Sequence, residues 1–349
     1  MRKISSGPHR AVLNFIALAC LTGLPVSVGA EGLPGVTGRD KLYDVEVAGN
    51  HAWIVGFPGI ILHSGDRGRT FERQGPGGTT AWLAVDFTDE RHGVVVGRGG
   101  NALVTGDGGK TWTAHEMGTR EPLFDLSCPD ATRCYAVGNF AAALKSEDGG
   151  RTWTPMNVVP EGEDPSLNGV HFADVNTGYA VGEFGLVART TDAGASWERV
   201  DDGMNADNNF GVAAQKDGSV VVVGSYGLVQ VGRVVPVKNE GESTDPDTVD
   251  GGQKTVDTEM TFTTLPTGIK EHLFRVTGTL GGLIASGEAG ALLTAPGVKG
   301  PWTVASTPTF QWLAMAQVDD KGHGFALGGH GTLLFTADGG KTWKKWRAQ

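Results

Sequence analysis

Short apolar runs of about five residues, separated by glycine-rich or polar turns, recur along the chain from about residue 42 onward. The clearest unit contains four such runs, at residues 167–172, 178–182, 186–190 and 196–200. Each run has the length of a β-strand, and apolar positions show no helical period outside the N-terminus. The pattern therefore predicts an all-β protein built from four-stranded units.

A glycine ends the second run of each unit and measures the period of the repeat. It occurs at Gly56, Gly97, Gly138, Gly182, Gly224, Gly287 and Gly328, with spacings of 41, 41, 44, 42, 63 and 41 residues. Four strands in about 40 residues are typical of a β-propeller, because each small sheet buries its faces only against neighbouring blades. We expect a single propeller domain over residues 31–349. Its seven blades should cover approximately residues 42–74, 83–115, 123–156, 167–200, 209–265, 272–305 and 312–346.

Five units carry one short motif, the Asp-box. A Ser or Thr is followed by Asp two residues later, by Gly two residues further on, and by an aromatic residue three beyond the Gly. The motif has its carboxylate at Asp66, Asp107, Asp148, Asp192 and Asp338. A short carboxylate accepts hydrogen bonds from its own turn, and the glycine tolerates a positive φ. We interpret these residues as structural locks for the turn between the third and fourth strands.

The spacing of 63 residues places an insertion in the fifth blade, which lacks the Asp-box. Residues 238–259 are acidic and contain almost no large apolar side chains. Burial cannot offset the conformational entropy of ordering such a segment. We therefore expect an extended or mobile excursion between the third and fourth strands, dispensable for folding.

The N-terminal residues 1–30 have the pattern of a secretory signal peptide. Basic residues precede an apolar run at 11–28, and small residues form a cleavage site that ends at Ala30. A retained membrane anchor is the alternative, but the run is short and is interrupted by Gly23 and Pro25. We expect an exported protein, located in the periplasm or another extracytoplasmic compartment.

Cysteine content and charge agree with export. Cleavage would remove Cys20 and leave Cys128 and Cys134 on either side of one predicted hairpin, where a disulfide is the simplest expectation. Metal binding is the alternative, but two thiols without a nearby His pair make a poor zinc site, so we expect no metal. The chain has a formal net charge of −10, and loss of three leader cations would lower it to −13. Nucleic acid and anionic membrane surfaces are therefore not expected as partners.

Counting turns assigns residues to the two faces of the propeller. The first and third turns of each blade lie on one face, with the Asp-boxes, the cysteines and the insertion. The second turns and the links between blades lie on the other. That second face carries the partner-binding candidates Phe57, Trp82, Arg98, Phe140, Phe184, Tyr226, Trp312 and His330. We interpret it as a recognition surface, with the alternative that some of these rings wedge between blades.

Two segments, GYAVGEFGLVARTTDAGASW at 178–197 and CPDATRCYAVG at 128–138, resemble the photosystem II stability and assembly factor family of seven-bladed propellers. The likeness runs from about residue 42 to 346. It implies an exported, non-enzymatic and cofactor-free protein that binds a protein partner, namely a membrane-protein complex or its assembly intermediate. Photosynthetic members use an arginine patch, of which the candidate face here offers Arg98. We expect the chain to act as a monomer.

The competing enzyme class is the Asp-box glycosidases, including the sialidases. A sialidase needs an arginine triad and a tyrosine nucleophile, but only Tyr226 reaches the candidate face and no triad can be assembled there. Other glycosidases need two carboxylates, and Glu183 and Glu288 keep that alternative open. We expect no catalytic residues.

Three charged residues, Asp44, Asp125 and Arg275, occupy equivalent places in the innermost strands. They could meet near the central channel as part of a site. An ion pair between blades would explain the same pattern, and the sequence leaves the two alternatives open.

Overall fold

The computed structural model describes residues 32–348, apart from residues 202, 204–206, 237–257 and 280–281. The predicted leader, residues 1–30, and most of the predicted insertion lie outside the described residues. Within the described part, no helix is long and apolar enough to cross a membrane.

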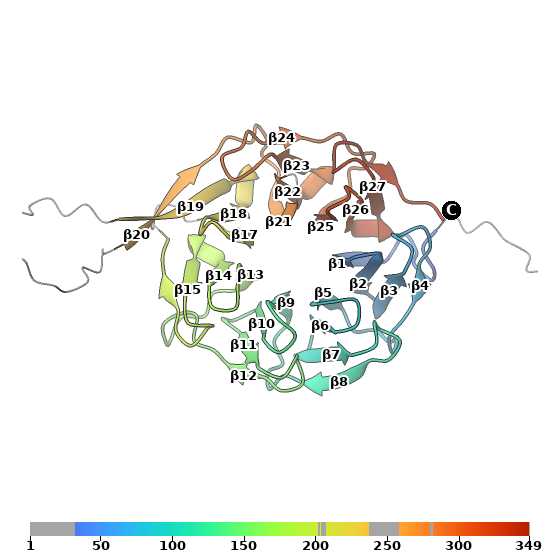
Figure 1. Ribbon diagram of the computed structural model, residues 1–349, viewed down its shortest axis with the longest axis horizontal. Helices are drawn as coiled ribbons and strands as arrows, with labels where there is room; N and C mark the ends of the chain where they lie inside the picture. Colours follow the sequence, from blue (N-terminus) through green and yellow to red (C-terminus); the bar gives the residue numbers. More distant parts are fainter. Residues whose placement is uncertain (1–31, 202, 204–206, 237–257, 280–281, 349) are drawn as a thin grey trace, which may run out of the picture.

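Seven antiparallel sheets of four strands surround a central axis (Figure 1). Each blade consists of four strands that are consecutive in the sequence, and the first strand of each is the innermost. The seven-bladed all-β propeller predicted from the repeat is confirmed.

The first four blades contain the strands β1 (Lys41–Ala48), β2 (His51–Phe57), β3 (Ile60–Ser64) and β4 (Glu72–Arg73); β5 (Trp82–Phe87), β6 (Gly93–Gly97), β7 (Asn101–Thr105) and β8 (Thr113–Glu116); β9 (Leu123–Ser127), β10 (Cys134–Gly138), β11 (Ala143–Ser146) and β12 (Thr154–Pro155); β13 (Leu167–Phe172), β14 (Gly178–Gly182), β15 (Val187–Thr190) and β16 (Glu198–Arg199).

The last three blades contain β17 (Asn209–Ala214), β18 (Val220–Gly224), β19 (Val229–Pro236) and β20 (Thr258–Thr264); β21 (Leu273–Thr279), β22 (Gly282–Gly287), β23 (Leu292–Ala295) and β24 (Thr303–Val304); β25 (Leu313–Val318), β26 (Gly324–Gly328), β27 (Leu333–Thr336) and β28 (Lys344–Lys345). Short 3-10 helices form the second turns of blades four to seven: η1 (Glu183–Gly185), η2 (Ser225–Gly227), η3 (Glu288–Gly290) and η4 (Gly329–Gly331).

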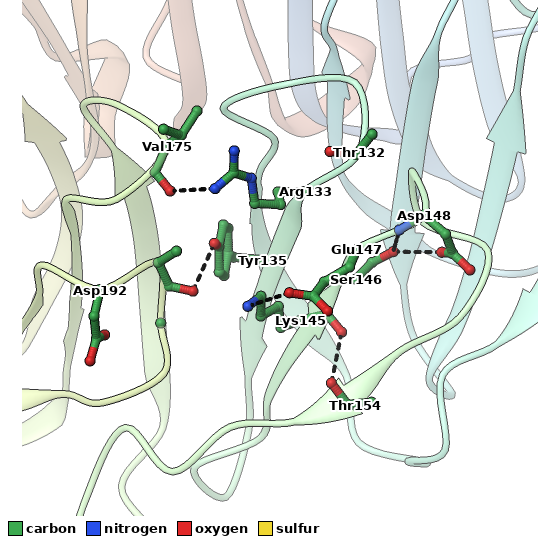
Figure 2. A network of polar contacts seen from close by, with 12 residues as sticks. Thr132, Arg133, Tyr135, Lys145, Ser146, Glu147, Asp148, Thr154, Val175 and Asp192 are labelled. Carbon is green, nitrogen blue, oxygen red and sulfur yellow. Dashed lines mark hydrogen bonds and ion pairs between the residues drawn. The ribbon is translucent and has the colours of Figure 1, made fainter.

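The core lies between neighbouring blades. The second strands are buried along most of their length, and their largest fully buried side chains are Trp53, Tyr135, Tyr179 and Phe325. Two of these rings also donate a hydrogen bond to the Asp-box turn of the next blade: Trp53 Nε1 to the carbonyl of Gly108 and the Tyr135 hydroxyl to the carbonyl of Ala193 (Figure 2). The Asp-boxes of blades two and four thus help to fix the position of each blade against the preceding one.

The ring closes without strand exchange, because both β1 and β28 remain in the sheets of their own blades. Apolar side chains of blades one and seven share one cluster, which Leu33 and Val36 of the N-terminal segment join. The indole Nε1 of Trp346, near the C-terminus, donates a hydrogen bond to the carbonyl of Gly68 in the first Asp-box.

The outer hairpin of blade five differs from the others. Strands β19 and β20 pair over seven positions, from Gln230 with Thr264 to Pro236 with Thr258, whereas the outer pairs of the other blades contain two to four positions. Thr258 and Glu259, which the sequence interpretation assigned to the insertion, belong to β20. Regular pairing therefore continues further into the inserted segment than its composition indicated.

Candidate functional site

Second turns and blade linkers form one face, which we call the second-turn face. In six blades the residue after the repeat glycine donates its backbone N–H to the carbonyl of a linker residue just before the innermost strand: Arg98 to Ala81, Asn139 to Pro122, Glu183 to Ser166, Ser225 to Asn208, Glu288 to His272 and Gly329 to Trp312. The candidate residues on this face therefore lie on turns that are tied to the body of the propeller.

Four of the candidates adopt a left-handed backbone conformation. Phe140, Phe184, Tyr226 and His330 have φ values of 49°, 57°, 55° and 58°. The equivalent position in blade two is Gly99, with φ of 79°. Glycine adopts this region without strain, whereas a bulky side chain there is an outlier that costs on the order of 1–2 kcal/mol. The aromatic residues at these turns are thus held in an unfavourable conformation.

These strained rings are displayed to solvent. Phe140, Phe184 and Tyr226 are 62%, 67% and 67% exposed, and Phe57 of blade one is 39% exposed. One such residue would need no explanation, but four exposed aromatic side chains on the same face make that face a candidate interaction surface. Arg98 and His330 are exposed as well.

Trp82, which the sequence analysis assigned to the recognition surface, is not part of that surface. It is only 4% exposed and packs between blades one and two, in a cluster with Trp53 and Ile61. Here the alternative of a ring wedged between blades holds. Trp312 is partly exposed and stacks on Tyr43, with ring centroids 6.1 Å apart.

A cavity of about 430 Å³ opens at the centre of this face, and we call it the mouth cavity. Each innermost strand contributes one equivalent residue to its lining: Tyr43, Leu83, Phe124, Asn168, Phe210, Phe274 and Ala314. Trp312 and Arg275 complete the wall. Every one of the seven equivalent residues sits at a register shift between the first and second strands of its blade. Such bulges redirect side chains, and here they occur at the same level in all seven blades.

A second, polar cavity of about 260 Å³ lies deeper in the channel, and Arg275 lines both cavities. Its guanidinium forms an ion pair with Asp125, which joins blade six to blade three across the axis. Asp44 also lines this cavity, and burial raises the pKa of its carboxyl to about 7 despite the nearby Arg275. The three charged residues of the innermost strands therefore do meet near the channel, and two of them form an ion pair between blades, as one of the two alternatives from the sequence had it.

The channel carboxylates also connect neighbouring blades. Asp44 accepts a hydrogen bond from the N–H of Val85, and Asp86 accepts one from the N–H of Cys128 at 2.7 Å. Burial raises the pKa of Asp86 to about 7, and the nearby carboxylates of Asp44 and Asp125 add to the shift. Because each acid is used as an acceptor between blades, the cluster has a structural explanation.

The Asp-box face has a different chemistry. In each box the Ser or Thr hydroxyl donates to the carboxylate, which also accepts the backbone N–H and the hydroxyl of the residue four positions later. Figure 2 shows the contact between Ser146 and Asp148 in the third blade. These hydrogen bonds lower the pKa values of all five carboxyls, to about 2 for Asp148, Asp192 and Asp338. The predicted disulfide between Cys128 and Cys134 is confirmed.

The two carboxylates that would serve a glycosidase are engaged by the turns. The Oε2 atom of Glu183 accepts the N–H of Ser166 at 2.9 Å, and the Oε2 atom of Glu288 accepts the N–H of His272 at 3.3 Å. Both therefore tie a second turn to its linker. In the described part of the chain, no group of three or more His, Cys, Asp and Glu residues has an arrangement that could hold a metal ion.

Sequence reasoning missed the aromatic residues of the channel. Phe124, Phe210 and Phe274 line the mouth cavity, and the linker residue Phe310 is 92% exposed. The signal for the first three was their position one residue after the residue that opens each innermost strand. The sequence pattern does not show that a side chain at this position lines the channel, because its direction depends on the bulge in the strand.

Comparison with known proteins places this geometry in context. Residues 112–207 match the family model described as photosynthesis system II assembly factor YCF48, which confirms the resemblance seen in the sequence. The fold is similar to YCF48 from Cyanidioschyzon merolae, with a TM-score of 0.56 and 18% identity over 76% of this chain and 85% of that one. A structure of YCF48 bound to D1 peptide gives a TM-score of 0.54 and 19% identity, over 76% of this chain and 80% of that one.

An ancestral GH74 enzyme also shares the architecture, with a TM-score of 0.58 and 11% identity over 88% of this chain and 49% of that one. A search of curated protein sequences gives no significant match. At these identities the likeness to solved structures establishes a common propeller fold.

Proposed function

We propose that this protein is an exported, non-enzymatic binding protein whose second-turn face recognises a segment of a protein partner. The partner class we propose is a membrane or envelope protein complex, or an intermediate in its assembly.

A single observation carries the proposal: large aromatic side chains are both solvent-exposed and held in the left-handed conformation at equivalent turns of blades three, four and five. Glycine would fit these positions at lower conformational cost. Residues in strained backbone conformations concentrate at binding and catalytic sites, where the surrounding structure maintains them. Aromatic side chains are also enriched among the residues that dominate binding energy at protein interfaces.

Two comparisons support the nature of the partner. The family whose model matches residues 112–207 is named for an assembly factor of photosystem II. One protein with the same fold has been solved bound to a D1 peptide. By analogy, we propose that the present chain binds a peptide segment of its partner rather than a small substrate.

The proposal of export rests on the leader-like N-terminal sequence and is supported by the disulfide on the Asp-box face. Disulfides persist in oxidising compartments and are rare in the cytosol. N-terminal sequencing of the protein recovered from its cells should begin at Glu31. Recovery of a chain that retains its first 30 residues in the membrane fraction would favour the anchor.

The binding proposal is tested with the triple variant Phe140→Asn, Phe184→Asn and Tyr226→Asn. Asparagine tolerates the left-handed region, so the turns should be preserved. The mature protein should capture a membrane protein from detergent extracts of its own cells. Because an aromatic interface anchor contributes about 2 kcal/mol or more, loss of even two anchors in the triple variant should lower the affinity about a thousandfold.

A matched control places three asparagines on the opposite face, at the exposed positions Lys110, Ala195 and Lys341. This control should capture the same partner as the wild type. Undiminished capture by a folded triple variant would contradict the assignment of the face. Glycoside cleavage by the wild type that is lost in Glu183→Gln or Glu288→Gln would contradict the non-enzymatic role.

A further inference from the structure

The mouth cavity is distinct from the exposed turns around it. Large apolar or aromatic side chains supply most of its wall, including Phe124, Phe210, Phe274 and Trp312. Some of these rings also contact one another. Phe210 and Phe274 lie edge to face with their ring centroids 6.0 Å apart, and Trp312 stacks on Tyr43. The cavity of about 430 Å³ falls within the range of sites that bind organic ligands and is far larger than the roughly 30 Å³ occupied by one water molecule.

The charge of the lining limits what can enter. Arg275 is the one charged residue among the nine residues that line the cavity, and Asp125 neutralises it through their ion pair. The acidic side chains of the channel line the deeper cavity instead. A charged side chain in the mouth cavity would therefore lose hydration without gaining an opposite charge. The lining is suited to an uncharged, apolar group.

The rings of the wall favour one kind of apolar group over another. Phe124, Phe210, Phe274 and Trp312 all line the mouth cavity. Aromatic pairs in offset-stacked or edge-to-face arrangements gain about 0.5–1.5 kcal/mol beyond the burial of their area. An aliphatic side chain of the same size would gain the burial but not this interaction between rings.

We propose that the mouth cavity is an anchor pocket for one aromatic side chain of an extended partner segment. This inference rests on the proposed function, because the segment must cross the second-turn face to deliver the side chain. The exposed rings of Phe140, Phe184 and Tyr226 lie on turns of the same face and would contact residues of the segment on either side of the anchor.

The test uses short peptides and does not depend on the identity of the partner. The probes are acetylated, amidated Gly-Ser-X-Ser-Gly peptides in which X is 4-fluorophenylalanine, cyclohexylalanine or lysine. Cyclohexylalanine is the saturated analogue of phenylalanine. Binding is followed by fluorine line broadening of the first peptide and by competition with the others. The aromatic peptide should bind about two- to tenfold more tightly than the cyclohexylalanine peptide, because of the interaction between rings, and the lysine peptide should not compete.

Two substitutions locate the binding. Ala314→Trp places a large side chain in the mouth cavity and should weaken binding of the aromatic peptide by about tenfold or more. Ala337→Trp makes the same change at an exposed position of the Asp-box face and should leave binding unchanged. Circular dichroism of both variants checks that the propeller is intact. Phe274→Leu provides a second, milder variant, which should reduce the preference for the aromatic peptide over cyclohexylalanine.

The outcomes separate this inference from the proposed function. Equal binding of the aromatic peptide by wild type and Ala314→Trp would overturn the anchor pocket, whatever the partner-capture experiment gives. Equal affinity for the aromatic and cyclohexylalanine peptides would overturn the aromatic specificity. Binding of free fluorobenzene but not of the peptide would show a pocket for small molecules and also contradict the proposal. If the protein binds the aromatic peptide specifically but captures no membrane protein, the anchor pocket would be supported and the proposed function would be contradicted.

Discussion

The two faces of this propeller are made from turns of the same blades, yet their turns are built in opposite ways. On the Asp-box face, side-chain oxygens accept the hydrogen bonds that each turn offers, and glycine occupies most of the left-handed positions. On the second-turn face, Phe140, Phe184 and Tyr226 occupy left-handed positions and leave their rings in solvent.

The difference indicates that the turns on one face stabilise the fold and that the turns on the other face serve binding. A turn whose polar groups are all satisfied stabilises the fold and offers little to a partner. A turn that holds an aromatic ring in a strained conformation gives up stability, and a binding role explains why it would be retained. Substitutions on the two faces should therefore have opposite effects on the free energy of unfolding.

The largest change in stability is expected on the Asp-box face. Asp148→Ala removes the acceptor for the N–H and hydroxyl of Thr152 and for the hydroxyl of Ser146. With about 1 kcal/mol net for a typical hydrogen bond, the loss of these three should lower the free energy of unfolding by about 3 kcal/mol. Denaturant unfolding measures the change, and Asp148→Asn, which keeps one acceptor oxygen, should cost less. An unchanged midpoint for the Ala variant would show that the box is not a lock.

An opposite and smaller effect is expected on the second-turn face. Phe184→Asn relieves the left-handed strain and loses little burial, because the ring is 67% exposed. The free energy of unfolding should stay constant or rise by up to about 1 kcal/mol. Phe310→Asn is the matched control, since Phe310 is 92% exposed but is not among the residues with positive φ. A loss of more than about 1 kcal/mol for Phe184→Asn alone would contradict the contrast between the faces.

Titration can sharpen the comparison between the Asp-boxes and the channel. Burial raises the pKa of Asp86 to about 7, so the folded protein binds this proton more tightly than the unfolded chain, whose Asp pKa is about 3.9. Stability from this group is complete below about pH 4 and declines as the pH rises toward 7. Asp86→Asn retains an acceptor for the N–H of Cys128 and should make that decline shallower.

The box carboxylates titrate in the other direction. The pKa of Asp148 is lowered to about 2, so its stabilisation is present above about pH 4 and is lost as the pH falls toward 2. Thermal unfolding between pH 4 and 7 measures the channel effect separately. Asp89→Asn serves as a control, because the pKa of exposed Asp89 is lowered to about 2 and its carboxylate therefore stays ionised in the folded protein throughout that window. An identical pH slope for wild type and Asp86→Asn would contradict the role of the buried acid.

The smallest effect is expected for the insertion of blade five. The paired ladder of β19 and β20 ends at Pro236 and Thr258, so an Asn-Gly turn can replace residues 237–257 and join the two strands directly. The melting temperature should remain nearly unchanged, because the replaced residues are acidic and poor in apolar side chains. A large decrease would show that the insertion contributes to the packing of the propeller.

Most of the fold could be predicted because its signals are local and repeated. The repeat glycines, the five Asp-boxes and the pair Cys128 and Cys134 are each recognisable within about ten residues. Repetition then made the architecture clear, since a four-stranded sheet of this size is stable only between two similar neighbours.

The candidate site required the tertiary structure, because exposure depends on side chains from other blades. Trp82 and Phe184 both looked suitable for display, yet Trp82 packs against Trp53 and Ile61 of the preceding blade, while Phe184 remains in solvent. Asp125 and Arg275 are 150 positions apart in the sequence and meet only because blades three and six face each other across the axis. The mouth cavity likewise exists only where seven bulges meet at one level. The sequence by itself determined the blades and their turn locks, which depend on local hydrogen bonding. Only the closed ring decided which aromatic residues are buried, which line the channel and which are free to bind.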